Sequence, residues 1–194
     1  MKRLLPFSPS GFLGFAAGCL IAYWLLYQKQ GFLAVTIGGA VSGICIGLRG
    51  KRFLYALLAA LGFALAALPE AFLIGVSMLG LYFNEEPRQL RVSLETMTFF
   101  FFGFTIIGAV GALISDPRYA ARRVISGIKS FGLVSLCGSI VLESLRFMGH
   151  IPKVFPLGVA LLTYATAGGI YKGLVLRQDA DREEIRLTML KLND

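Results

Sequence analysis

Long apolar runs alternate with short polar connections along this chain, and the pattern predicts helices that cross a membrane. The apolar runs cover approximately residues 11–27, 32–48, 53–83, 96–115, 124–145 and 154–176. About 20 apolar residues are enough for a helix to cross a hydrocarbon core about 30 Å thick. A membrane β-barrel would show alternating segments of about ten residues instead. We therefore expect an all-α fold, a polytopic bundle of six transmembrane helices.

Two stretches of the chain repeat one layout. Residues 36–70 and 105–143 each contain a glycine-bearing apolar helix, a basic turn and a second apolar helix that ends at a glutamate. The sequence TIGGAV at 36–41 matches TIIGAV at 105–110, and TAGG at 166–169 is a shorter trace of the same pattern. Both stretches begin on the same predicted side of the membrane. The repeat is therefore expected to be parallel, with its axis along the membrane normal.

Glycines within the apolar runs are the expected helix-packing positions. Residues 39, 43 and 47 fall on one face of a helix, where another helix backbone can approach closely. Such a face can pack inside the chain or form an interface between subunits, and the sequence leaves both readings open. The full set of predicted packing residues is Gly39, Gly43, Gly47, Gly108, Gly111, Gly168 and Gly169.

The charges indicate how the chain is oriented. The net charge is +8, although only 15% of residues are charged, and the Lys and Arg residues gather in alternate connections. Such an excess marks the cytoplasmic side, so both termini are expected inside, and nucleic acid is not an expected partner. The residues expected to set this topology are Arg49, Lys51, Arg52, Arg118, Arg122 and Arg123. The localisation that follows is the inner membrane of a bacterium, or of a bacterium expressing a phage gene.

The last residues differ in composition from the rest. Residues 1–176 form the predicted transmembrane domain, and residues 177–194 form a charged cytoplasmic tail. Asp181 and Glu184 resemble a capping box that would start a separate helix. Ile185, Met189 and Leu192 would share one face of that amphipathic helix, which could lie on the membrane surface or dock a partner.

Two glutamates are the candidate chemical groups. Glu70 and Glu143 end apolar runs, and the rise of a helix from the preceding basic turn places each near the outer interface. Pro69 is expected to kink or end the helix beside Glu70. The glutamates are either solvated or paired helix ends, Glu143 with Arg146, or carboxylates at a pore mouth or cation site. A solute pocket would use Glu70, Glu143 or Tyr164.

Catalytic, metal and cofactor motifs are missing from the sequence. The three cysteines lie separately inside apolar runs, and the single histidine, His150, has no partner in sequence. No phosphate-binding GxxxxGK and no HExxH occur. We therefore expect a protein that is not an enzyme and that holds no metal or cofactor.

Residues 105–176 resemble small phage holins that have three membrane spans. The resemblance consists of the small-residue helix IIGAVGA, the basic turn DPRYAARR, the ending LE at 142–143, the turn MGHIPK, the helix TAGGIYKG and a charged tail. Three further spans precede this unit, which holins of that kind lack. The resemblance implies oligomerisation in the inner membrane and a non-specific lesion or pore.

Three functions therefore remain open from the sequence. The first is an oligomeric, holin-like pore or channel that assembles through its glycine-rich faces. The second is a small-solute transporter, and the third is a membrane subunit of a larger complex. In each case the expected partners are the lipid bilayer together with further copies of the chain or other membrane subunits.

Overall fold

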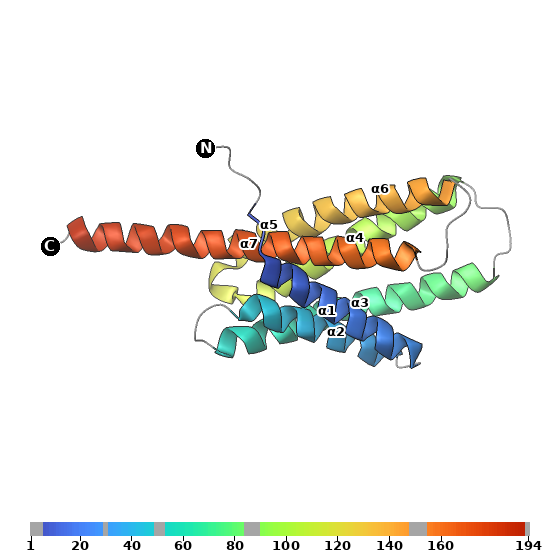
Figure 1. Ribbon diagram of the computed structural model, residues 1–194, viewed down its shortest axis with the longest axis horizontal. Coiled ribbons are helices and arrows are strands. Elements are labelled where there is room, and N and C mark those ends of the chain that lie inside the picture. Colours follow the sequence, from blue (N-terminus) through green and yellow to red (C-terminus); the bar gives the residue numbers. More distant parts are fainter. Residues whose placement is uncertain (1–5, 29–30, 49–52, 84–89, 148–154, 193–194) are drawn as a thin grey trace.

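The computed structural model of the protein describes residues 6–28, 31–48, 53–83, 90–147 and 155–192, and over these ranges the chain is helical with no strand (Figure 1). Side chains are described except at 27, 31–32, 69–97, 99–100, 143, 145–157, 160 and 191–192. The elements are α1 (Pro9–Tyr27), α2 (Gly31–Gly47), α3 (Phe53–Phe83), α4 (Leu90–Ser115), the 3₁₀ turn η1 (Pro117–Tyr119), α5 (Ala120–Gly127), the π-helical turn η2 (Ile128–Gly132), α6 (Leu133–Phe147) and α7 (Phe155–Leu192). The predicted all-α fold is confirmed for these residues.

The helices form one bundle in which neighbours in sequence are mostly neighbours in space. Helix α2 packs against both α1 and α3, and α3 packs against α4. Helix α7 returns from the end of the chain to pack against α1 and α6. The C-terminal part of α7 projects beyond the bundle, roughly along the direction of the helices (Figure 1).

Aromatic rings fill the centre of the bundle. The ring of Phe15 lies 5.3 Å from Phe63, 5.5 Å from Phe131 and 4.9 Å from Tyr164, measured between centroids. Tyr171 joins them, 6.0 Å from Phe63. These residues come from α1, α3, η2 and α7, so one cluster ties together both halves of the chain. Aromatic pairs at such separations stabilise a core beyond the area they bury.

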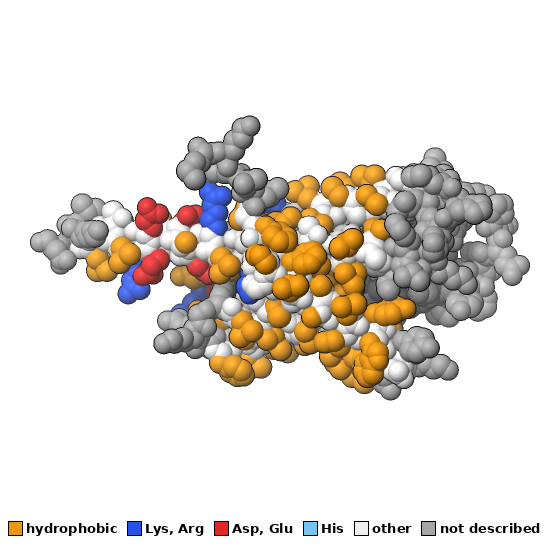
Figure 2. Space-filling view, viewed as in Figure 1, with side chains coloured by type: hydrophobic (Ala, Val, Ile, Leu, Met, Phe, Trp, Pro, Cys, Tyr) orange, Lys and Arg blue, Asp and Glu red, His pale blue; other side chains and the backbone are white. Residues whose placement is uncertain are grey.

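Many large apolar side chains are exposed on the described outer surface of the bundle. Figure 2 shows hydrophobic side chains over the bundle, whereas the charged ones gather on and near the projecting part of α7. Two described segments, Pro9–Leu26 and Pro117–Leu142, are long and apolar enough to cross a membrane. The helical segments Leu33–Gly47, Phe53–Leu68 and Phe101–Ser115 are apolar but shorter. A membrane-facing bundle is thus favoured by its surface.

Glycines allow the helices of each half to approach closely. A β-carbon placed on Gly43 or Gly47 would overlap backbone atoms of α3, at Ala59 and Ala56. Gly39 meets the backbone of Phe63 in the same way. This face of α2 is therefore covered by α3 within the same chain.

The second half uses its glycines similarly but with a different set of neighbours. A β-carbon on Gly108 would lie 2.6 Å from the carbonyl oxygen of Gly127 in α5. One on Gly111 would meet the ring of Phe63, at 2.7 Å. Gly168 and Gly169 of α7 instead receive the side chains of Phe15 and Phe7.

Three helix boundaries differ from those expected. Helix α3 continues through Pro69 to Phe83, so the proline does not end it, and a kink at Pro69 stays a prediction. Helix α4 begins at Leu90, within the polar segment expected to be a loop. Helix α7 runs from Phe155 to Leu192 without a break, so no helix starts at a capping box near Asp181, and that prediction is wrong. A helix already formed upstream propagates through polar residues more easily than a new one nucleates.

Candidate functional site

A fully buried arginine lies where α7 leaves the bundle. Arg123 of α5 has no exposed surface. Its Nε donates to Asp116 Oδ2 at 3.3 Å, and its Nη1 donates to the carbonyl of Val175 at 3.1 Å and to Gln178 Oε1 at 2.8 Å. Its Nη2 donates to Asp179 Oδ1. Four of the five N–H groups of the guanidinium are thus engaged.

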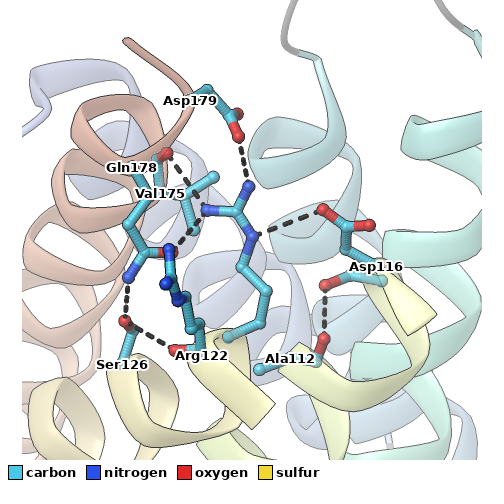
Figure 3. Close-up of polar contacts among 9 residues, drawn as sticks. Ala112, Asp116, Arg122, Ser126, Val175, Gln178 and Asp179 are labelled. Carbon is cyan, nitrogen blue, oxygen red and sulfur yellow. Dashed lines mark hydrogen bonds and ion pairs between the residues drawn. The ribbon is translucent and has the colours of Figure 1, made fainter. Parts of the chain in front are cut away.

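Local structure aims these groups at one point. Pro117 begins the 3₁₀ turn directly after Asp116, which places that carboxylate beside the start of α5. Successive residues of a helix point about 100° apart, so Arg122 is exposed while Arg123 faces inward. Figure 3 shows Asp116 approaching from one side of the cluster, with Gln178 and Asp179 approaching from α7.

A second layer of hydrogen bonds extends the cluster to the next turn of α5. Gln178 Nε2 donates to Ser126 Oγ at 2.8 Å, and Ser126 Oγ donates to the carbonyl of Arg122 at 3.0 Å (Figure 3). Gln178 therefore accepts from Arg123 and donates to Ser126 at once. We call Asp116, Arg123, Ser126, Gln178 and Asp179 the arginine cluster.

The electrostatics of the arginine cluster favour a fixed arrangement. The side chains of Arg123 and Asp116 are 1% and 4% exposed, whereas that of Asp179 is 40% exposed. Desolvating a charge costs several kcal/mol, and only several good partners can offset this cost. The cluster therefore holds α7 against α5 at one register, because no other position of α7 would present the same acceptors.

Lys172 is a second buried cation. It belongs to α7 and lies less than two turns before Gln178. It is 5% exposed, and its Nζ donates to the carbonyl of Cys45 in α2. Nearby, the backbone N–H of Ser8 donates to the carbonyl of Gly169 at 2.9 Å. Helix α7 is thus joined by polar contacts to α2 and to the start of α1, in addition to α5.

A charged hollow lies just outside the arginine cluster. It has a volume of about 570 Å³ and is lined by Tyr119, Asp179, Arg182, Glu183 and Arg186. The guanidinium carbon of Arg182 lies 3.2 Å from the centroid of the Tyr119 ring. Arg186 approaches Glu183 at 3.9 Å. The hollow therefore forms between η1 and the first turns of the projecting part of α7.

Most of the residues that the sequence singled out for a site have side chains outside the described part of the chain. The side chains of Glu70, Glu143 and Arg146 lie outside the described residues, as do Arg49, Lys51 and Arg52. Tyr164 belongs to the aromatic core. Of the residues expected to set topology, Arg118 and Arg122 are exposed, but Arg123 is buried in the protein.

Sequence reasoning missed the arginine cluster. The sequence pattern predicts a turn at Asp116, places Gln178 and Asp179 in the charged tail, and places Arg123 among several basic residues beside the membrane. A usable signal existed, because Asp116 lies only seven residues before Arg123, near enough in sequence for the two opposite charges to pair across the turn. The partners on α7 lie more than fifty residues away, and their contact could not be derived from sequence spacing.

The described residues at this end of the bundle offer charged and hydrogen-bonding groups. Among the described residues, no group of three or more His, Cys, Asp or Glu could hold a metal ion. Neither the protein-family models, nor the curated proteins, nor the solved structures gave a match to this chain. A function must therefore be inferred from the geometry of the chain itself.

Proposed function

We propose that this chain is a membrane-embedded assembly subunit that holds the projecting part of α7, residues 180–192, in the cytoplasm for a partner protein. In this proposal the bundle crosses the membrane six times, with both termini inside. The observation that carries the proposal is the continuity of α7. One helix of 38 residues begins in the apolar bundle and extends beyond it as a charged rod.

The length of α7 supports this arrangement. At 1.5 Å per residue the helix is about 57 Å long, nearly twice the thickness of a hydrocarbon core. The arginine cluster fixes the helix at the level of Val175 to Asp179. The position and direction of the remaining part are thereby fixed by the bundle, as expected of a docking element.

The surface of the projecting part fits a protein partner better than a lipid surface. It carries charges of both signs, whereas helices that bind anionic membranes are rich in Lys and Arg. Ile185, Leu187, Met189 and Leu190 are all more than half exposed. Mixed charges around exposed apolar side chains suit a helix that packs against other helices.

The holin-like pore and the transporter receive less support. The glycine face of α2 is covered by α3, so it is not free to form an interface with another copy. Phe15, Phe63, Phe131 and Tyr164 occupy the centre of the described bundle, where a water-filled path would need polar groups. An assembly role requires neither a path nor a free glycine face.

Affinity capture of the full chain from its native membranes tests the proposal. We expect a protein partner to co-purify and to be lost when residues 181–194 are deleted. Ile185→Asp with Met189→Asp should also abolish capture, because both side chains lie on one face. Leu187→Asp is the matched control, since Leu187 is also an exposed apolar residue and lies two residues from both Ile185 and Met189, on the opposite face of the helix. Capture that survives the deletion would refute the assembly role of α7, and capture of tagged second copies alone would identify a homo-oligomer instead.

A further inference from the structure

The hollow beside α7 is lined by two arginines, two acidic residues and one tyrosine. Its lining includes two arginines, Arg182 and Arg186, which lie four residues apart and so on the same face of α7. Tyr119 closes the hollow on the side of the bundle. The hollow opens on the surface, where a ligand can enter from solvent or from the lipid headgroups.

Charge pairing within this region is uneven. Asp179 is engaged by the buried Arg123, and Glu183 faces Arg186. The guanidinium of Arg182 instead lies over the ring of Tyr119. Among the described residues that line the hollow, Arg182 is therefore the arginine that packs on an aromatic ring.

Stacking on Tyr119 prepares Arg182 for an anion. An aromatic ring contacts the flat face of a guanidinium and leaves the N–H groups at its edge free to donate. The stacking also restricts the rotamers of a long side chain, which lowers the entropy lost on binding. A fixed planar fork of donors matches the oxygen atoms of phosphate.

The position of the hollow along the bundle favours phosphate as the anion that binds there. It lies next to the point where α7 leaves the apolar bundle, beside the exposed Arg118 and Arg122. In the orientation proposed above, on which this inference rests, that level is the inner headgroup region of the membrane. Basic residues at this level attract anionic lipids, each contributing about 1 kcal/mol.

We propose that Arg182, held on Tyr119, binds a phosphate group in this hollow, supplied by an anionic lipid headgroup or by a soluble phosphate. The test uses the purified full chain in micelles of a neutral detergent. Native mass spectrometry measures how much phosphatidylglycerol the chain retains, compared with phosphatidylcholine. In a separate experiment, the melting temperature of the chain is measured as inorganic phosphate is added. The variants are Arg182→Gln, Tyr119→Leu and Tyr119→Phe.

Arg177→Gln is the matched control, because it removes the same charge from an exposed position of α7 outside the hollow. We expect Arg182→Gln to weaken retention of phosphatidylglycerol about fivefold, the factor that 1 kcal/mol represents. Tyr119→Leu should also weaken it, while Tyr119→Phe, which keeps the ring, should bind as the parent chain does. The site would be assigned to soluble phosphate by two results together. The parent chain would retain no phosphatidylglycerol, and inorganic phosphate would raise the melting temperature of the parent chain but not of Arg182→Gln.

Two results would overturn the phosphate site. Equal losses in Arg182→Gln and Arg177→Gln would show a diffuse positive surface, and no loss in Arg182→Gln would show that the stacked guanidinium does not bind. The titration in micelles contains no partner protein and does not depend on membrane orientation. Failure of the phosphate site and failure of the assembly role can therefore be told apart.

Discussion

Arg123 is the residue on which the position of α7 depends most. Its guanidinium joins Asp116, the carbonyl of Val175, Gln178 and Asp179. We expect Arg123→Met to destabilise the protein by about 3–5 kcal/mol, because the substitution leaves the buried carboxylate of Asp116 without its cation. Thermal unfolding in detergent should show the loss as a melting temperature lower by roughly 10 °C.

Matched variants separate the charge of Arg123 from its geometry. Arg122→Met changes an exposed neighbour and should alter stability by less than about 0.5 kcal/mol. Arg123→Lys keeps the charge but cannot reach four acceptors with one ammonium group, so it should also be destabilising. An Arg123→Met protein as stable as Arg122→Met would contradict a clamping role for the arginine cluster.

Gly43 is the residue at which close helix packing is tested most directly. A β-carbon there would overlap the backbone of α3 at Ala59. We expect Gly43→Ala to cost about 1–3 kcal/mol, because α2 and α3 must move apart. Gly158→Ala is the control, since a β-carbon at Gly158 would meet nothing within 4 Å. That control should stabilise α7 by up to about 1 kcal/mol, since alanine favours a helix. If thermal unfolding gives the two variants the same effect, the contact is not formed.

At the scale of residues, sequence patterns predicted the glycine positions better than they predicted the polar cluster. The spacing of Gly39, Gly43 and Gly47 defines a face without reference to any other helix. What that face packs against is a property of tertiary structure, and it proved to be α3 of the same chain. Arg123 looked like its exposed neighbour Arg122 in the sequence, because only its partners on α7 distinguish the two.

The π-helical turn η2 is the element that links α5 to α6. Ile128–Gly132 contains buried Ser130 and Phe131, while Lys129 is exposed. A π turn closes its hydrogen bonds over one more residue than an α-helix does. Deleting Lys129 should therefore convert the turn to regular α-helix and leave both flanking helices in their positions.

The control deletion removes Ile140, an exposed residue within the regular part of α6. It should rotate every later residue of α6 by about 100° and destroy the packing of α6 on α7. Limited proteolysis in detergent should therefore show a protected chain for the Lys129 deletion and a rapidly cleaved chain for the Ile140 deletion. Equal sensitivity of the two would show that the π turn is required for the fold.

At the scale of elements, the positions of the apolar helices could be predicted, and their ends could not. Hydropathy detects residues that avoid water, and it changes sharply at the edge of a membrane. Helical hydrogen bonding does not follow hydropathy, so α4 begins in a polar segment and α7 continues to Leu192. The π turn was missed for a different reason, because every residue of Ile128–Gly132 is compatible with either an α-helix or a π-helix.

The whole molecule combines an apolar bundle with polar groups at one end. The aromatic cluster lies between the helices, and the arginine cluster lies where α7 leaves them. The fold class followed from the apolar runs, because a chain with such runs has few ways to satisfy its backbone in lipid. Which end of the bundle faces the cytoplasm is a separate prediction, and it rests on the basic residues of alternate connections.

Reporter fusions test the proposed orientation of the whole molecule. Alkaline phosphatase becomes active only outside the cytoplasm, whereas green fluorescent protein folds well within it. A fusion after Asp194 should therefore be fluorescent with green fluorescent protein and inactive with alkaline phosphatase. A fusion after Arg88, which lies between α3 and α4, should show the reverse, since three crossings separate it from the N-terminus. Phosphatase activity at both positions would mean an even number of crossings between Arg88 and Asp194 instead of three, and α7 would then project away from any cytoplasmic partner.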